Sequence, residues 1–154
     1  MRLYLVQHGE ALPKDQDPDR PLTERGEVDT RHVGQFLADH SITVEGLFHS
    51  GKTRAQQTAE LLSEYVCPGL LPEAMEGLGP NDPTGPVVDR ITHWSRDTLL
   101  VGHLPFMGRL AAALTTGAEE PVPMAFQPGS VVCLEHDPHG AWLLAFMVRP
   151  DLLR

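Results

Sequence analysis

The chain alternates short apolar runs with longer stretches in which apolar residues recur every three or four positions. Short uninterrupted apolar runs bounded by glycine are typical of buried strands, whereas the wider spacing is typical of helices that bury one face. This pattern predicts strands at 2–6, 46–50, 70–71, 98–102, 130–135 and 141–148. It predicts helices after Thr23, from Thr53, over 87–94 and from Phe106, with loops over 11–21 and 76–86.

The order of these elements predicts the fold class. Alternating strands and helices favour a mostly parallel sheet with helices on both faces. The last two strands are joined through Asp137-Pro138-His139-Gly140, a hairpin signal. We therefore predict an α/β fold, a three-layer α/β/α sandwich whose mostly parallel central sheet ends in a C-terminal antiparallel hairpin. Because the sequence contains no repeat or linker, residues 1–154 are predicted to form a single domain.

Composition excludes several classes of protein. The chain has 154 residues, with 12 Lys+Arg against 21 Asp+Glu and a formal net charge of −9. This acidic balance argues against nucleic acid and anionic membrane surfaces as partners, because both select a basic face. No apolar run approaches the ~20 residues of a membrane span, and the first residues do not have the pattern of a signal peptide. We therefore expect a cytoplasmic protein.

Two minor features of the composition bear on chemistry. Cys67 and Cys133 are too few for a disulfide framework and are expected to be buried, reduced thiols. Among the 12 basic residues only Lys14 and Lys52 are lysines, and the rest are arginines. Arginine is the better residue for forked recognition of phosphate or carboxylate, so an anion is the first ligand to consider.

Candidate chemistry gathers at three strand ends. Ligands of parallel sheets bind outside the carboxyl ends of the strands, where His8 and His103 directly follow two of the predicted strands. Arg54 lies one turn into the helix after another, and Arg20 lies in a loop that can fold over the same place. Taken singly, each could be a turn histidine or a solvated arginine. Together they make a phosphate pocket that contains a nucleophile.

Other site chemistries lack their motifs. The eight histidines could supply metal ligands, but no His-x-x-x-His or Cys-x-x-Cys spacing is present, so no metal is expected. The motifs GxxxxGK[ST], GxGxxG and G-x-S-x-G are absent as well, which removes the usual signs of a nucleotide cofactor or a serine nucleophile. The remaining hypothesis is a phosphate site without metal or cofactor, in which histidine is the reacting group.

Four segments, in the right order, resemble the motifs of the histidine phosphatase (phosphoglycerate mutase-like) superfamily. Gln7-His8-Gly9 resembles its R-H-G signature, and Gly102-His103-Leu104-Pro105 resembles its late G/S-H-x-P motif. Between them, residues 20–26 resemble R-P-L-T-x-x-G and residues 50–59 resemble S-x-x-x-R-A-x-Q-T-A. With its short length, the chain is most similar to the SixA-like protein phosphohistidine phosphatases.

The resemblance implies a role for each residue. His8 would take the phosphoryl group, Arg20 and Arg54 would hold its oxygens, and His103 would donate a hydrogen bond to the same oxygens. The reaction would be a two-step in-line transfer through phospho-His8, followed by hydrolysis. The substrate would be a phosphohistidine on a protein of signal transduction, such as a histidine phosphotransfer domain, and phosphate would be the product.

One position departs from the family pattern. Gln7 stands where the motif has arginine, and its amide offers hydrogen bonds to phosphate but neither charge nor a forked pair of donors. Loss of one such donor lowers a rate on the order of a hundredfold. We therefore expect a slower phosphatase, and the alternative is a phospho-ligand binding module with little or no turnover. Lys52 is a candidate for restoring part of the charge.

A third hypothesis is a phosphatase of small phosphate esters. An alkoxide leaving group needs an acid to protonate it, whereas imidazole departs more easily. The candidates for such an acid are Glu76 and Asp82 in the loop rich in proline and glycine, with Asp17 and Asp19 near Arg20 as others. The simpler interpretation of these four side chains is that they are solvated loop carboxylates.

Overall fold

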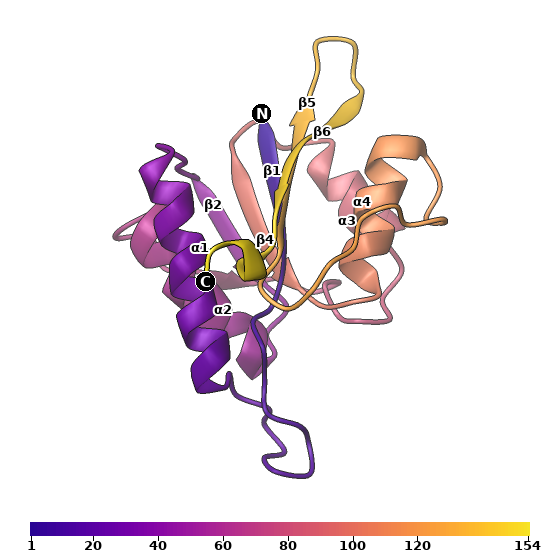
Figure 1. Cartoon of the computed structure of the whole chain (residues 1–154). Coiled ribbons are helices and arrows are strands. Elements are labelled where there is room, and N and C mark those ends of the chain that lie inside the picture. The colour runs from indigo at the N-terminus through magenta and orange to yellow at the C-terminus, as the bar shows by residue number, and fades with distance from the viewer.

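The computed structural model describes all 154 residues, and its central sheet lies between two helical layers (Figure 1). The strands are β1 (Arg2–Gln7), β2 (Gly46–His49), β3 (Glu73–Ala74), β4 (Thr98–Gly102), β5 (Val131–His136) and β6 (Trp142–Val148). The helices are α1 (Glu24–Asp39), α2 (Thr53–Val66), α3 (Gly85–Ile91) and α4 (Phe106–Thr116), followed by the 3-10 turn η1 (Pro150–Leu152).

The topology of the sheet confirms the predicted fold class. Its six strands lie in the order β3-β2-β4-β1-β5-β6. The pairs β1–β4, β2–β4 and β2–β3 are parallel, whereas β5 runs antiparallel to β1 and to β6. The central strands β1 and β4 are neighbours, and their register pairs Gln7 with Gly102. This register brings the residues that follow the two strands, His8 and His103, to the same edge of the sheet.

Both faces of the central strands are buried, and each face is covered by its own helices (Figure 1). Tyr4 and Val6 of β1 belong to the apolar cluster under α1 and α2. Leu3 and Leu5, which alternate with them, belong to the cluster under α3 and α4. A strand buried on both faces reads as a continuous apolar run, which is why these strands are recognisable in the sequence.

The third strand is not where the apolar pattern predicts it. It lies at Glu73–Ala74, after Pro72, and Leu71 of the predicted strand is 78% exposed. Proline has no amide N–H to donate to a neighbouring strand, so pairing with β2 begins only after it. The pairs of this ladder are Phe48 with Glu73 and His49 with Ala74. At this edge of the sheet, the availability of backbone N–H groups decides where the strand forms, and the apolar side chains of Leu70 and Leu71 do not.

Helix α3 is shifted relative to its prediction. It spans Gly85–Ile91 instead of 87–94, so the loop that precedes it is shorter than 76–86. Pro86 lies in its first turn, where backbone N–H groups have no acceptor within the helix. The missing N–H of proline therefore costs no hydrogen bond, and Pro86 is compatible with the start of the helix.

Two further sequence expectations can be compared with the structure. Cys67 and Cys133 are free and buried, as predicted. No helix combines the length and the apolar character that crossing a bilayer requires.

Candidate active site

The structure brings the two predicted histidines and Arg54 together at the carboxyl edge of the sheet. The ring centroids of His8 and His103 are 5.0 Å apart, with the ring planes tilted by 53°. From the first turn of α2, the Nε–H of Arg54 donates to Nε2 of His8 at 3.3 Å. The charge of Arg20 lies near enough to lower the pKa values of both histidines and of Arg54.

His8 is a buried, neutral imidazole with a defined orientation. Its Nδ1 lies 2.7 Å from the carbonyl oxygen of Gly9, and because a carbonyl can only accept, Nδ1 carries the proton. Burial lowers the pKa of His8 to about 4, against the opposing effect of the Gly9 bond and with help from the charges of Arg54 and Arg20. Nε2 therefore keeps a lone pair at neutral pH, which is the state that a nucleophile requires.

The turn after His8 is held by a threonine that sequence reasoning did not select. The Gly9 N–H donates to Oγ1 of Thr58 at 2.9 Å, and the Thr58 hydroxyl donates to the carbonyl of Arg54 at 2.8 Å. A Cβ on Gly9 would lie 2.8 Å from Oγ1 of Thr30, so only glycine fits there. Thr58 thus ties the His8 loop to the helix that carries Arg54. The sequence does contain a signal for Thr58, because it lies four positions after Arg54 and so on the same face of the helix.

His103 is also neutral, and it is 2% exposed against 9% for His8. Burial, followed by the proximity of His8, Arg54, Lys52 and Arg20, lowers its pKa to about 3. Its Nε2 lies 2.6 Å from Oγ of Ser50, while its Nδ1 is buried without a hydrogen-bond partner. In the sequence Ser50 is recognisable only as the first residue of a family motif, and the structure makes it the polar partner of His103.

Arg20 and Arg54 carry the positive charge of the site. Neither forms an ion pair, whereas Asp29, Glu119 and other carboxylates neutralise arginines elsewhere in the chain. Arg20 has a left-handed backbone (φ 49°), and its Nε–H donates to the carbonyl of Leu12 at 3.0 Å. Such a conformation is uncommon for a residue other than glycine and is frequent at functional sites. Two unpaired guanidinium groups beside neutral imidazoles suit an anion.

Gln7 lies next to this group without joining its hydrogen bonds. It is 8% exposed, and its backbone bonds to the 129–130 turn, where it donates to Ser130 and accepts from Gly129. Its side-chain oxygen is buried and has no partner. The structure therefore places an uncharged amide in the strand beside Gly102-His103, where the family motif has arginine.

The structure does not bring the candidate acids into contact with either histidine. Asp82 accepts the N–H of Gly79 at 2.8 Å, and Asp17 accepts that of Asp19 at 2.9 Å, so both carboxylates stabilise turns of their own loops. Glu76 is exposed and lines a surface hollow with Arg90, His93 and Trp94.

Two other polar residues, Lys52 and His49, lie near the site but form no hydrogen bond with His8 or His103. Lys52 is exposed at the N-cap of α2, and its charge reaches His103 without a direct contact. His49 is buried, and its Nδ1 accepts the N–H of Gly51 at 3.0 Å. No group of three or more His, Cys, Asp or Glu side chains is arranged to hold a metal ion.

Comparison with known proteins gives a consistent result. The sequence profile of the histidine phosphatase superfamily (branch 1) matches residues 3–78. An uncharacterized protein of Picosynechococcus sp. is 36% identical over 124 residues, which cover 76% of this chain and 74% of the relative. The phosphohistidine phosphatase SixA of Escherichia coli is 27% identical over 162 aligned residues, which cover 100% of this chain and 97% of that protein.

The fold comparison extends over the whole chain. The structure of the protein histidine phosphatase SixA complexed with tungstate superposes with a TM-score of 0.88 and 25% sequence identity, covering 100% of both chains. The similarity therefore includes the elements that carry His8, Arg54 and His103.

Proposed function

The chain belongs to the histidine phosphatase superfamily as a SixA-like member, and from this premise we propose that it removes phosphoryl groups from phosphohistidine through a covalent intermediate on His8. The observation that carries the proposal is the state of His8. Its Nδ1 proton is held by the Gly9 carbonyl, and its Nε2 lone pair faces Arg54.

In the first step, the Arg54 Nε–H moves from Nε2 of His8 to a phosphoryl oxygen, and the freed Nε2 lone pair attacks phosphorus in line with the bond to the substrate nitrogen. A new P–N bond forms to His8 while the P–N bond of the substrate breaks, and the electron pair leaves with the substrate imidazole, which carries a proton on its other nitrogen. Arg20, Arg54 and His103 stabilise the three equatorial oxygens, because charge accumulates there in the transition state.

In the second step, water attacks phospho-His8 from the position that the leaving imidazole vacates. The P–N bond breaks, its electron pair returns to Nε2, and the proton lost by water leaves with inorganic phosphate. His8 is then neutral again, because the site disfavours its charged form. No metal or cofactor takes part in the proposed cycle.

The surroundings of the histidines favour phosphohistidine over a phosphate ester. Protonating an alkoxide requires a carboxylic acid beside the leaving group, but Asp82 and Asp17 bond within their own loops and Glu76 lines a separate surface hollow. An imidazole leaving group does not need such an acid. The full-length similarity to SixA supports the same choice, and the proposed partner is a phosphorylated protein such as a histidine phosphotransfer domain.

Trapping of the intermediate tests this proposal. Incubation with a ³²P-labelled phosphohistidine protein, followed by rapid denaturation in alkali, should give an acid-labile label on His8. The label should be absent from His8→Ala, and His93→Asn, which alters an exposed histidine whose hydrogen bonds are to Thr92 and Asp89, should be labelled like the wild type. Equal turnover by His8→Ala and wild type would exclude the mechanism.

Gln7 supports a second candidate, a phospho-ligand binding module without turnover. In that case the wild type would bind phosphate or vanadate but release no phosphate from phosphohistidine, phosphoramidate or phosphate esters. A labelled His8 with measurable phosphate release decides for the phosphatase, while binding without release decides for the module.

A further inference from the structure

The two ring nitrogens of His103 have different surroundings. Nε2 lies 2.6 Å from Oγ of Ser50, and Nδ1 is buried with no partner. A neutral imidazole has one N–H, so only one of these nitrogens can donate. Whether His103 presents a proton or a lone pair at Nδ1 therefore depends on which way the hydrogen bond to Ser50 runs.

The surroundings of Ser50 decide that direction. Its Oγ already accepts the backbone N–H of Lys52 at 3.3 Å. Its hydroxyl proton also needs an acceptor, and Nε2 of His103 is the only acceptor with which Oγ forms a hydrogen bond. The reverse direction would put the ring proton on Nε2 and leave Nδ1 as a buried lone pair, which cannot donate a hydrogen bond to a phosphoryl oxygen.

We propose that Ser50 is a positioning residue that donates its hydroxyl proton to Nε2 of His103 and thereby keeps the ring proton on Nδ1, where it can be donated to a phosphoryl oxygen. The inference rests on the proposed function for the presence of that oxygen. It adds a residue whose only contact with the reaction is through His103.

This arrangement gives the two histidines the same tautomer and opposite tasks. In His8 the Gly9 carbonyl holds the proton on Nδ1, so that the ring presents the Nε2 lone pair. In His103 the Ser50 hydroxyl occupies Nε2, so that the ring presents its N–H. One acts as a nucleophile and the other as a hydrogen-bond donor, although both are buried and neutral.

The fold explains why residue 50 can hold this position. Strand β2 lies beside β4, with His49 paired to Val101, so the next residue of each strand leads to the same edge of the sheet. Gly51 then turns away with φ 89°, a left-handed conformation that leaves Ser50 at the end of the strand.

The direct test is the tautomer of His103 in the ligand-free wild type, measured by ¹⁵N correlation NMR of the histidine rings. We expect Nδ1 protonated and Nε2 unprotonated. The opposite pattern overturns the inference, whether or not any variant folds. Because this measurement needs no turnover, it is decided independently of the His8 labelling that tests the proposed function.

Variants give the kinetic test. Ser50→Ala should lower kcat for phosphoramidate about tenfold or more, as expected for a weakened oxyanion donor, and should shift the His103 proton toward Nε2. Ser50→Thr keeps a hydroxyl and should restore most of the rate and the Nδ1–H signal. If Ser50→Ala folds as the wild type does and keeps both kcat and the Nδ1–H tautomer, the positioning role is wrong. Failure of Ser50→Thr to exceed Ser50→Ala would contradict it equally.

Discussion

At the scale of single residues, burial and charge have separate tasks in this site. His8 and His103 are kept neutral mainly because they are buried, with pKa values of about 4 and about 3. In the proposed reaction, the positive charge that holds the phosphoryl group would therefore come from Arg20 and Arg54, neither of which is neutralised by a carboxylate. Gln7 adds no charge, so the site has one cation fewer than the family motif specifies.

Gln7→Arg tests the consequence of that missing charge. The substitution should raise kcat/KM for phosphoramidate by about tenfold to a hundredfold, because it restores a charged, forked donor at the end of β1. Phosphate release measures the effect. Gln7→Met, with a chain of similar length but no donor, is the matched control and should not gain activity. If the arginine variant folds and is no faster than the wild type, Gln7 does not limit the reaction.

At the scale of elements, α2 organises the site by binding both neighbouring motif segments. Thr58 holds Gly9, and Oε1 of Gln57 accepts the N–H of Leu22 at 2.8 Å in the segment that follows Arg20. The start of α1 contacts the His8 loop from the other side: a Cβ on Gly26 would lie only 2.1 Å from the carbonyl oxygen of Glu10. Thr58, Gln57 and Gly26, which belong to the family motifs but not to the proposed catalytic residues, therefore fix how α1 and α2 pack against the His8 loop.

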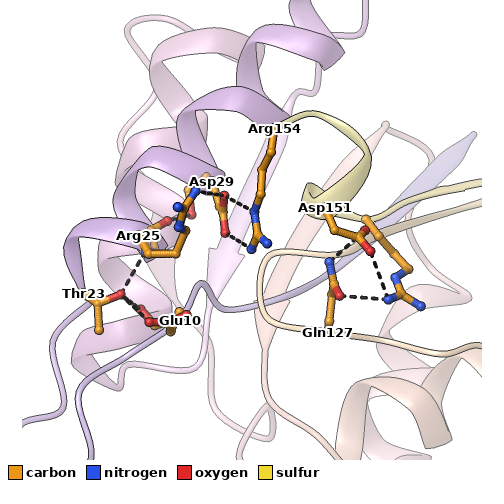
Figure 2. A network of polar contacts seen from close by, with 10 residues as sticks. Glu10, Thr23, Arg25, Asp29, Gln127, Asp151 and Arg154 are labelled. Carbon is orange, nitrogen blue, oxygen red and sulfur yellow. Dashed lines mark hydrogen bonds and ion pairs between the residues drawn. The ribbon is translucent and has the colours of Figure 1, made fainter.

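Thr23→Ala tests the cap that begins α1 (Figure 2). Oγ1 of Thr23 accepts the Gly26 N–H at 3.0 Å and donates to the Glu10 carboxylate at 3.0 Å. Loss of an N-cap of this kind lowers the free energy of unfolding by about 1 kcal/mol. Urea denaturation measures it, and Thr23→Ser, which keeps the hydroxyl, should stay close to the wild type. Equal stability of Thr23→Ala and wild type would show that the cap contributes nothing here.

At the scale of the whole molecule, residues 149–154 connect α1 to the loop before β5 (Figure 2). Arg154 pairs with the buried carboxylate of Asp29 at 2.8 Å, and Gln127 donates to Asp151 at 3.0 Å. Pro150 of the same segment packs closely against Gly129: a Cβ on Gly129 would lie only 2.9 Å from Cγ of Pro150. The Gly129 N–H in turn reaches the carbonyls of Gln7 and His8, at 3.0 and 3.1 Å. Residues 149–154 therefore support the backbone of Gln7 and His8 through their contact with Gly129.

The neutral histidines also make the stability of the whole molecule depend on pH. Their folded pKa values lie below the value of about 6.5 for an unfolded histidine, so in acid the unfolded chain binds more protons than the folded one. The free energy of unfolding should thus change little from this source above about pH 7 and fall as the pH drops toward 4, by about 3 kcal/mol between about pH 6.5 and 5 for the two histidines together.

Chemical denaturation at a series of pH values measures this dependence. The double variant His8→Asn, His103→Asn lacks both groups and should lose stability less steeply over the same window, while His93→Asn, at an exposed position, serves as the control. Parallel curves for the wild type and the double variant would contradict the lowered pKa values of His8 and His103 in the folded state.

The amino-acid sequence by itself determined the types and order of the elements and the candidates His8, Arg20, Arg54 and His103. These are consequences of local patterns: apolar runs stop where strands leave the core, and parallel strands end at one edge of a sheet. The same local reasoning misplaced the third strand, because pairing at an edge depends on which backbone N–H groups are available.

Only the tertiary structure decided which polar groups meet. Ser50 reaches His103 across 53 residues, Thr58 reaches Gly9 across 49, and Asp82 is occupied by its own turn. A hydrogen bond depends on distances of a few tenths of an ångström between segments that are remote in sequence, and no periodicity encodes them. Burial is decided in the same way, and with it the neutral state of both histidines. Composition indicated an acidic chain, whereas the fold placed the unpaired Arg54 in contact with His8 and brought the charge of Arg20 near both uncharged imidazoles.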